Sequence, residues 1–283
     1  MRSVKFLVAA GAASLLSSMA FAADLAIAPP PMSYAPPADF GGWYLRGDIG
    51  MTNQRLRSLD NPGDPDAPLF KSTGLGFDSS TLWDVGVGYQ FNNWFRADVI
   101  GQWRGRANFH GSQSIPFGGA FGPFFTEANN YSGSKSEAVV MANAYVDLGT
   151  WWCVTPYIGA GIGTSYNRIS GFRDDGVSIN TAITPPLSNS VTYAGDAGKW
   201  NFAWALHAGL AYRVTPNVTI ELGYSYMSLG DAVTGPTNSF DGVTVVNGSQ
   251  FVMKNITSND LKLGVRWNLE SAPVYAPPLV TKG

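Results

Sequence analysis

Residues 83–91 read Trp-Asp-Val-Gly-Val-Gly-Tyr-Gln-Phe, the clearest structural pattern in the chain. Every second residue from Trp83 to Phe91 is large and apolar, while the residues between them are Asp, Gly, Gly and Gln. Successive side chains of a β-strand point to opposite faces, so the pattern predicts a strand with one apolar and one polar face. Asn92 and Asn93 follow at once and predict a tight turn into another strand.

The same alternation recurs along the chain. It predicts eight strands, at residues 43–53, 81–91, 94–104, 136–149, 156–168, 199–213, 218–228 and 258–269. Short turns follow the second, fourth and sixth strands. Four long loops are expected at residues 54–78, 105–135, 170–198 and 229–257. Short turns at one end and long loops at the other are typical of outer-membrane barrels, whose tilted strands need about 9–11 residues to cross the hydrocarbon.

The composition fits a membrane barrel and excludes several other classes. Charged residues make up 13% of the chain and aromatic residues another 13%, whereas a soluble domain carries about 25% charged residues. The mean hydropathy of -0.01 does not suggest a bundle of transmembrane helices. A net charge of -2 lacks the excess of positive charge that nucleic-acid binding requires. With one cysteine and two distant histidines, His110 and His207, we expect no disulfide framework, no metal site and no cofactor.

The apolar faces indicate which solvent surrounds the barrel. A soluble eight-stranded barrel, such as a lipocalin, turns its apolar face inward, and a membrane barrel turns that face to lipid. An eight-stranded barrel has a narrow interior, which faces rich in Trp and Tyr would overfill. We therefore predict an all-β fold: an eight-stranded antiparallel up-and-down transmembrane β-barrel with four long extracellular loops and short periplasmic turns.

The aromatic residues provide a separate check on this orientation. If the short turns and both chain ends lie on the periplasmic side, the aromatic residues fall near two rims, as expected for interfacial girdles. The predicted girdle residues at the turn rim are Trp43, Tyr89, Trp94, Tyr212 and Trp267, and those at the opposite rim are Trp103, Tyr166 and Trp200.

The polar faces would then line the lumen. Their charges have mixed signs and need partners or water at this depth. The predicted lumen network contains Arg46, Asp48, Asp84, Arg96, Asp98, Asp147, Glu221, Lys262 and Arg266, with Arg104, Glu137 and Asp260 on the same faces. We interpret it as a salt-bridged plug that closes a narrow barrel. The alternative is a small gated pore, although nearly balanced charge does not favour an ion-selective filter.

Other candidate chemistry is weak. His207, Ser225 and Glu221 invite comparison with a hydrolase triad, but chance proximity in a small polar lumen explains them better. Residues 159–163 resemble a nucleotide-binding loop but lack the third glycine and a following helix. We expect these glycines to relieve crowding inside the barrel. Cys153 is expected to be a half-buried thiol.

Outside the barrel, the two ends of the chain have the sequence features of a signal peptide and of proline-rich spacers. Two basic residues, an apolar run at 6–16 and small residues before Ala23 predict a secretory signal peptide. The expected organisation is a signal peptide at 1–22, a Pro-rich periplasmic segment at 23–40, an eight-stranded outer-membrane barrel at 41–269 and a Pro-containing C-terminal tail at 270–283.

Two segments carry a resemblance to a known family. Residues 22–25 (Ala-Ala-Asp-Leu), the proline run and residues 41–50 (Gly-Gly-Trp-Tyr-Leu-Arg-Gly-Asp-Ile-Gly) resemble the mature start of small alphaproteobacterial outer-membrane proteins. Residues 261–269 resemble their closing strand. This is the family of opacity-protein-like, outer-membrane-protein-A-like eight-stranded barrels, and its motifs carry fold more than function.

The resemblance implies a bacterial outer-membrane location and a non-enzymatic role. We expect a structural and surface protein of the adhesin or antigen type, serving envelope integrity and surface interaction through its loops. Expected partners are outer-membrane lipid, lipopolysaccharide and a host or cell-surface ligand, with no nucleic acid. A small porin-like channel and, less favoured, a lipid-modifying enzyme are the alternatives.

Overall fold

The computed structural model describes residues 41–64, 66–118, 121–243 and 245–269. The chain separates into two units, residues 1–38 and 39–283, and all described residues belong to the second. The predicted signal peptide at 1–22, the Pro-rich segment at 23–40 and the tail at 270–283 lie outside the described residues. No helix among the described residues is both long and apolar enough to cross a membrane.

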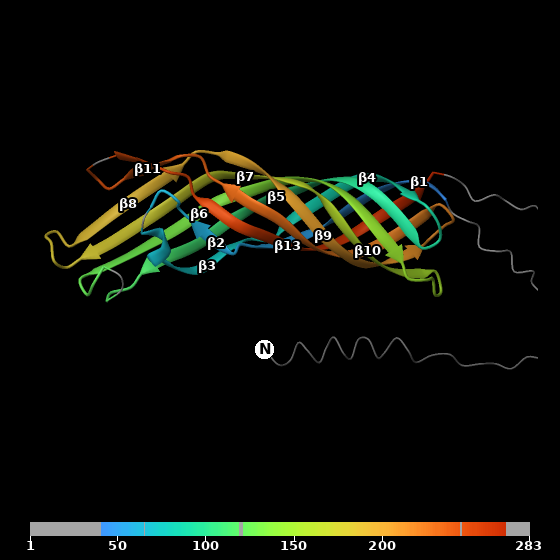
Figure 1. Ribbon diagram of the computed structural model, residues 1–283, viewed down its shortest axis with the longest axis horizontal. Coiled ribbons are helices and arrows are strands. Elements are labelled where there is room, and N and C mark those ends of the chain that lie inside the picture. The colour runs from blue at the N-terminus through green and yellow to red at the C-terminus, as the bar shows by residue number, and fades with distance from the viewer. Residues whose placement is uncertain (1–40, 65, 119–120, 244, 270–283) are drawn as a thin grey trace, which may run out of the picture. The chain divides into compact units, whose positions relative to one another are not determined.

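Eight antiparallel strands close into a ring in which each strand pairs with its two neighbours (Figure 1). In ring order they are β1 (Gly42–Arg55), β4 (Ser80–Gln90), β5 (Phe95–Ile115), β6 (Phe125–Asp147), β7 (Val154–Asn180), β9 (Ala197–Arg213), β10 (Val218–Val233) and β13 (Val252–Asn268). Pairing of β1 with both β4 and β13 completes the closure, for example at Gly47, which faces Val85 on one side and Val265 on the other. The predicted eight-stranded antiparallel barrel is therefore confirmed.

Five shorter strands extend the sheet at the end away from the short turns (Figure 1). They are β2 (Ser58–Asp60), β3 (Lys71–Phe77), β8 (Leu187–Ala194), β11 (Thr237–Phe240) and β12 (Val245–Gly248), with one short 3-10 helix, η1 (Ala67–Leu69). β8 pairs with β7, β11 with β8 and β12 with β11, so one wall continues beyond the ring. We call this end the distal end and the other the turn end.

The predicted strand boundaries hold at the turn end and fail at the distal end. β5 runs to Ile115 instead of residue 104, and β6 begins at Phe125 instead of residue 136. β7 likewise continues to Asn180 instead of residue 168. Much of the sequence expected as loop at 105–135 and 170–198 is therefore strand. Its outward residues are mostly polar, apart from a few such as Leu187 and Tyr193, whereas those of the predicted strands were apolar.

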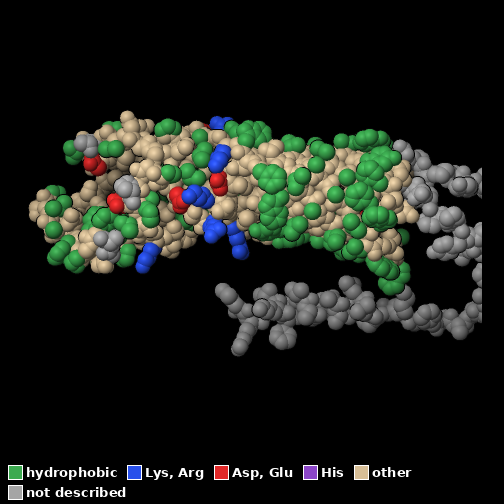
Figure 2. Space-filling model, in the orientation of Figure 1, with side chains coloured by type: hydrophobic (Ala, Val, Ile, Leu, Met, Phe, Trp, Pro, Cys, Tyr) green, Lys and Arg blue, Asp and Glu red, His purple; other side chains and the backbone are tan. Residues whose placement is uncertain are grey.

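Near the turn end, the outer surface of the ring is apolar. Ile49, Phe202 and Leu261 are 65%, 68% and 57% exposed. Hydrophobic side chains cover this part of the surface in Figure 2. Such a surface, closed over a polar interior, requires lipid around it. We call these outward side chains the apolar belt: Leu45, Ile49, Val85, Val99, Val140, Ile162, Phe202, Leu206, Leu222, Leu261, Leu263 and Val265.

Towards the distal end the polarity reverses, because large apolar side chains turn inward. Phe109 and Phe172 are each 1% exposed, and Tyr131 and Phe251 are 5% and 6% exposed. Their rings contact one another, with centroids of Phe172 and Phe251 4.8 Å apart. We call this cluster the apolar plug: Leu59, Phe77, Phe109, Tyr131, Ile169, Phe172, Leu229, Phe251, Met253 and Ile256. The distal part is thus built like a water-soluble β-structure around an apolar core.

Candidate functional site

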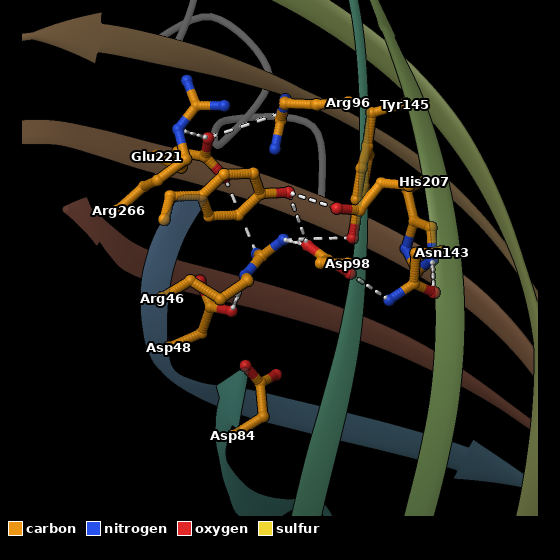
Figure 3. Close-up of polar contacts among 12 residues, drawn as sticks. Arg46, Asp48, Asp84, Arg96, Asp98, Asn143, Tyr145, His207, Glu221 and Arg266 are labelled. Atoms are coloured by element: carbon orange, nitrogen blue, oxygen red, sulfur yellow. Dashed lines mark hydrogen bonds and ion pairs between the residues drawn. The ribbon is translucent and has the colours of Figure 1, made fainter. Parts of the chain in front are cut away.

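All nine residues of the predicted lumen network lie inside the ring and are buried: Arg46, Asp48, Asp84, Arg96, Asp98, Asp147, Glu221, Lys262 and Arg266. Arg46 is a central member (Figure 3). Its Nη1 donates to Asp98 Oδ2 at 2.9 Å, and its Nη2 lies 2.8 Å from Asp48 Oδ2. Arg46 Nη1 also donates to Tyr145 Oη at 3.0 Å. One guanidinium on β1 thereby connects to strands β5 and β6 across the lumen.

A second centre of the network is Glu221 on β10. Three guanidinium groups surround its carboxylate: those of Arg96 and Arg266 at 3.4 Å each, and that of Arg46 at 3.6 Å. Arg96 is fully buried, and its guanidinium carbon lies 4.4 Å from the ring centroid of Tyr145 and 4.7 Å from that of Tyr157. Cation–π contacts of this kind strengthen when they are shielded from water.

A third centre surrounds Arg104 near the distal side of the belt. Its Nη2 lies 2.5 Å from Asp260 Oδ2, and its Nε lies 3.1 Å from Glu137 Oε1. Lys135 forms a close ion pair with Glu137 and donates to Gln54 Oε1 at 2.8 Å. Alternation placed Arg104, Glu137 and Asp260 on the lumen face. It missed Lys135, because that residue fell in a segment expected to be a loop.

His207 lies in the middle of the lumen, but the triad considered above does not assemble around it. Its Nδ1 is 2.8 Å from Ser225 Oγ. Its Nε2 is 3.1 Å from Asn143 Oδ1 (Figure 3). Glu221 is instead bound by the three arginines. The cavity beside His207 measures only about 10 Å³, which is room for about one water molecule.

The glycines of residues 159–163 relieve crowding, as predicted. A Cβ at Gly161 would lie 2.1 Å from Asn143 Oδ1, and one at Gly159 would lie 2.5 Å from a ring carbon of Tyr145. These glycines therefore let the polar side chains of β6 lie flat against the wall of β7.

The predicted girdle residues lie on the outer surface at the two edges of the apolar belt. At the turn end, Trp43, Trp94, Tyr212 and Trp267 are 53%, 56%, 51% and 57% exposed, and the ring of Tyr89 contacts that of Trp43 at 5.4 Å. At the other edge lie Trp103 and Trp200, which are 46% and 63% exposed, and Tyr166, whose ring lies 5.0 Å from that of Trp200.

Cys153 is exposed, so the expectation of a half-buried thiol is wrong. It lies in the turn between β6 and β7, where Trp152 and Cys153 adopt positive φ values of 49° and 68°. The tight reversal carries the thiol beyond the strand ends, where no neighbouring strand covers it.

The distal end holds a larger cavity, which we call the distal cup. Its volume is about 240 Å³. The apolar plug forms its floor through Tyr131 and Phe251, and polar residues from several strands and connections form its walls. These wall residues are Asn61, Asp64, Gln113, Glu127, Asn129, Asp174, Ser190, Thr192, Thr237 and Ser239. Sequence reasoning missed the cup, because its residues come from the four segments that were expected to be loops.

The cup is acidic. Asp64, Glu127 and Asp174 line it, and among the described residues no Lys or Arg does. Asp174 is only 8% exposed, and its Oδ1 has no hydrogen-bond partner. Burial raises the pKa of Asp174 to about 7, and the charges of Glu127 and Asp175 add to the effect. Burial also raises the pKa of Glu127.

Around the cup, the tips of the distal hairpins carry exposed apolar residues. Phe124, Ile183 and Val245 are 58%, 58% and 69% exposed. Hydrophobic side chains are visible at this end in Figure 2, far from the apolar belt. We call this set the distal rim: Phe117, Phe121, Phe124, Ile183, Leu187, Phe240, Val243 and Val245. Exposed apolar residues that gather beyond the membrane-facing surface mark an interaction site.

With the fold and these sites described, known proteins can be compared. A family model described as the outer membrane protein beta-barrel domain matches residues 8–268. The chain belongs to this family. In an outer-membrane barrel the short turns face the periplasm and the longer connections face outward. The turn end, including Cys153, is therefore periplasmic, and the distal cup and rim are extracellular.

Similar sequences include both uncharacterized and named proteins. An uncharacterized protein of Brucella suis biovar 1 is 32% identical over 226 residues, which cover 74% of this chain and 76% of that protein. The outer membrane protein PagN of Salmonella typhimurium is 29% identical, covering 65% of this chain and 70% of PagN. A putative adhesin of Rickettsia bellii is 29% identical, covering 78% of this chain and 88% of that protein.

Solved structures with a similar fold include two small outer-membrane proteins. OprG from Pseudomonas aeruginosa is 14% identical with a TM-score of 0.46, covering 81% of this chain and 97% of OprG. Neisserial surface protein A is 18% identical with a TM-score of 0.42, covering 81% of this chain and 97% of that chain.

Between the belt and the cup, the outer-membrane barrel carries a collar of exposed basic residues. Figure 2 shows Lys and Arg side chains gathered there. Some are paired: Arg168 lies 3.2 Å from Asp196, and Lys254 lies 2.5 Å from Asp60. We call this set the basic collar: Arg55, Arg57, Arg106, Arg168, Lys199 and Lys254.

Proposed function

We propose that this outer-membrane barrel is a surface protein of the adhesin type, which binds a host or cell-surface partner through its distal end. The observation that carries the proposal is the distal rim. The extracellular part has its own apolar core and yet leaves apolar side chains such as Phe124 and Val245 exposed at its tips. A water-facing structure of this kind exposes large apolar groups where a partner covers them. The likeness to a protein named as a putative adhesin supports the same function.

An adhesion assay tests this proposal. A non-adherent bacterium expressing the full chain should bind cultured host cells or other bacteria. The triple variant Phe117→Ser, Phe124→Ser, Val245→Ser should lose most of that binding. The matched control is His110→Ser, an exposed and polar change on the outer wall of β5. Gel mobility before and after heating verifies that each variant is assembled. Equal adhesion of the rim variant and the control would contradict the proposal.

The filled lumen disfavours the porin-like alternative. The cavity beside His207 is about 10 Å³, and one near the turn end, lined by Asp147 and Arg266, is about 30 Å³. Above them the apolar plug closes the distal side. An ion crossing this barrel would have to break buried ion pairs and pass an apolar core. Purified protein in a planar bilayer should therefore give no steady conductance steps, and reproducible steps would restore the pore hypothesis.

The geometry also disfavours a lipid-modifying enzyme. His207 is 6% exposed and faces the lumen, whereas a lipid substrate would approach from the belt or from the distal end. We propose that His207 joins Ser225 to Asn143 as part of the barrel interior. His207→Ala should leave the lipid A profile of the host bacterium unchanged. An altered profile would reopen the enzymatic hypothesis.

The basic collar supports lipopolysaccharide as a second partner. Cationic side chains at a membrane surface attract anionic head groups, at about 1 kcal/mol for each Lys or Arg. Arg55, Arg57 and Arg106 are exposed and form no ion pair with another described residue, so they are the collar residues best able to bind an anionic head group. Replacing these three by Gln should reduce the lipopolysaccharide that co-purifies with the barrel. The periplasmic changes Arg213→Gln and Asn93→Gln serve as controls.

A further inference from the structure

The extracellular cup contains a buried acid that the protein itself does not satisfy. Asp174 on β7 lies between Tyr131 of β6 and Thr192 of β8, its partners in the sheet. It is 8% exposed, and its Oδ1 has no hydrogen bond. The next residue, Asp175, points outward and is bound by Arg173 at 2.6 Å. A buried carboxylate without a donor is costly, so its presence in a cavity points to a ligand that supplies the donor.

The polar groups around Asp174 are already committed to other partners. Tyr131 Oη donates to Gln113 Oε1 at 2.9 Å, and Asn129 Nδ2 donates to Glu127 Oε1 at 3.1 Å. Thr192 Oγ1 donates to Ser239 Oγ at 2.9 Å. The polar side chains of the walls therefore bond to one another, and the Asp174 carboxylate remains an acceptor without a donor. Because Glu127 and Asp64 add negative charge, the missing donor is a cation.

The size and lining of the cup favour an organic cation over a metal ion. Its volume of about 240 Å³ is far larger than a bare ion requires. Among the described residues, no group of three or more His, Cys, Asp or Glu side chains is arranged to hold a metal. The floor is aromatic, with the rings of Tyr131 and Phe251 5.7 Å apart. An aromatic surface beside carboxylates suits an ammonium or guanidinium group and the alkyl chain that carries it.

We propose that the distal cup binds an ammonium or guanidinium group at the end of a flexible chain, with the Asp174 carboxylate as its principal partner. A lysine or arginine side chain of a protein partner and a free polyamine both present this chemistry. The inference rests on the proposed function, because it assumes that the distal end meets a partner outside the cell. The rim would contact apolar surface while the cup receives the cationic group.

Binding should depend on pH, because the acceptor must be ionised. The titratable groups that line the cup with Asp174 are Glu127 and Tyr131 on β6 and Asp64 in the connection after β2. Asp175 on β7 points outward, and its charge still raises the pKa of Asp174. β8 and β11 present only hydroxyl groups to the cup. With the pKa of Asp174 at about 7, the ionised fraction rises about tenfold between pH 6 and pH 8, and the apparent affinity rises in proportion.

Calorimetry on the full chain in detergent tests the proposal. The probes are Nα-acetyl-lysine methylamide, Nα-acetyl-arginine methylamide and spermidine. Binding should strengthen about tenfold from pH 6 to pH 8. Asp174→Asn should lose at least about tenfold at pH 8, as expected for a charge-assisted contact. Asp174→Glu should retain part of the affinity, and Asp175→Asn should retain all of it. Nα,Nε-diacetyl-lysine methylamide, which has no charge, should not bind.

Each outcome has a defined meaning. Preference for the amino-acid probes assigns the cup to a protein side chain, and preference for spermidine assigns it to a free polyamine. The inference is overturned if no cationic probe binds, if the diacetyl probe binds equally, or if Asp174→Asn and Asp175→Asn behave alike. Unchanged heat-dependent gel mobility ensures that Asp174→Asn is assembled. Cells that adhere while the cup binds no probe would overturn this inference alone, and a cup that binds probes on non-adherent cells would overturn only the adhesin function.

Discussion

Replacing Arg104 by Leu tests whether the lumen network holds the barrel together. Arg104 is 1% exposed and contacts four strands besides its own, β1, β6, β10 and β13. Its guanidinium donates two hydrogen bonds to Asp260, at 2.5 and 3.2 Å, and one each to Thr52 and Ser258 at 2.9 Å. The substitution leaves Asp260, itself 0% exposed, without these donors.

The expected loss follows from the burial of the pair. Removing one partner of a buried ion pair costs about 3–5 kcal/mol, because the other charge stays buried. Glu137 keeps its ion pair with Lys135 in this variant. Asp260 is therefore the carboxylate that chiefly loses its cationic partner. Replacing both Arg104 and Asp260 by Leu removes the stranded charge and should cost less than Arg104→Leu alone. The control Arg168→Leu breaks an exposed pair, 56% and 47% exposed, and should cost at most about 1 kcal/mol.

Urea unfolding in lipid vesicles, followed by tryptophan fluorescence and by gel mobility without heating, measures these differences. The expected order of stability is wild type and Arg168→Leu first, then the double variant, then Arg104→Leu. If Arg104→Leu were as stable as Arg168→Leu, the buried pair of Arg104 and Asp260 would not stabilise the barrel, and the reasoning would be refuted. If the double variant were the least stable, the stranded Asp260 charge would not be the cause of the loss.

Three further predictions concern other parts of the barrel. A Cβ at Gly88 would lie 2.2 Å from the Tyr44 ring, so Gly88→Ala should lower the unfolding midpoint in urea, whereas Gly101→Ala, with open space around it, should not. Cys153 should react with a membrane-impermeant maleimide in permeabilised cells and not in intact cells; labelling of intact cells would reverse the assigned orientation. The Asp174 pKa is raised from 3.8 to about 7, so the extracellular part should lose stability as pH rises from about 4 to 7. Hydrogen exchange should show this loss, and Asp174→Asn should abolish it.

Most of the barrel could be predicted from the sequence, because one physical rule governs every strand of the apolar belt. Outward residues meet lipid and inward residues meet a polar lumen, so a period of two is visible in stretches such as residues 83–91. The same rule placed Arg46, Asp98 and Glu221 on lumen faces. It does not specify which carboxylate pairs with which arginine, since those contacts cross the ring between strands far apart in the chain.

The extracellular part was harder to predict, because its solvent is different. Phe109 and Phe172 turn inward where the outer surface meets water. The segments around them lack the outward apolar residues by which the strands were recognised, so they were predicted to be loops. Asp174 shows that the sequence alone also could not predict this site. The adjacent pair Asp174 and Asp175 on an alternating strand indicates that one acid points inward. Only the pairing of β7 with β6 and β8 shows that this acid lies beside Tyr131 and Thr192.

The reversal of polarity is the physical reason for placing the proposed recognition chemistry at the distal end. In the belt, lipid outside forces the polar side chains inward, and in a narrow ring those charges are stable only when they are paired and packed, as around Glu221 and Arg104. Above the belt, water outside allows an apolar plug inside, which seals the lumen from the extracellular side. A ligand arriving from outside therefore reaches the cup and goes no deeper than the plug, which forms the floor of the cup. Only above the plug can an acid such as Asp174 stay both buried and accessible, and that is where the cup lies.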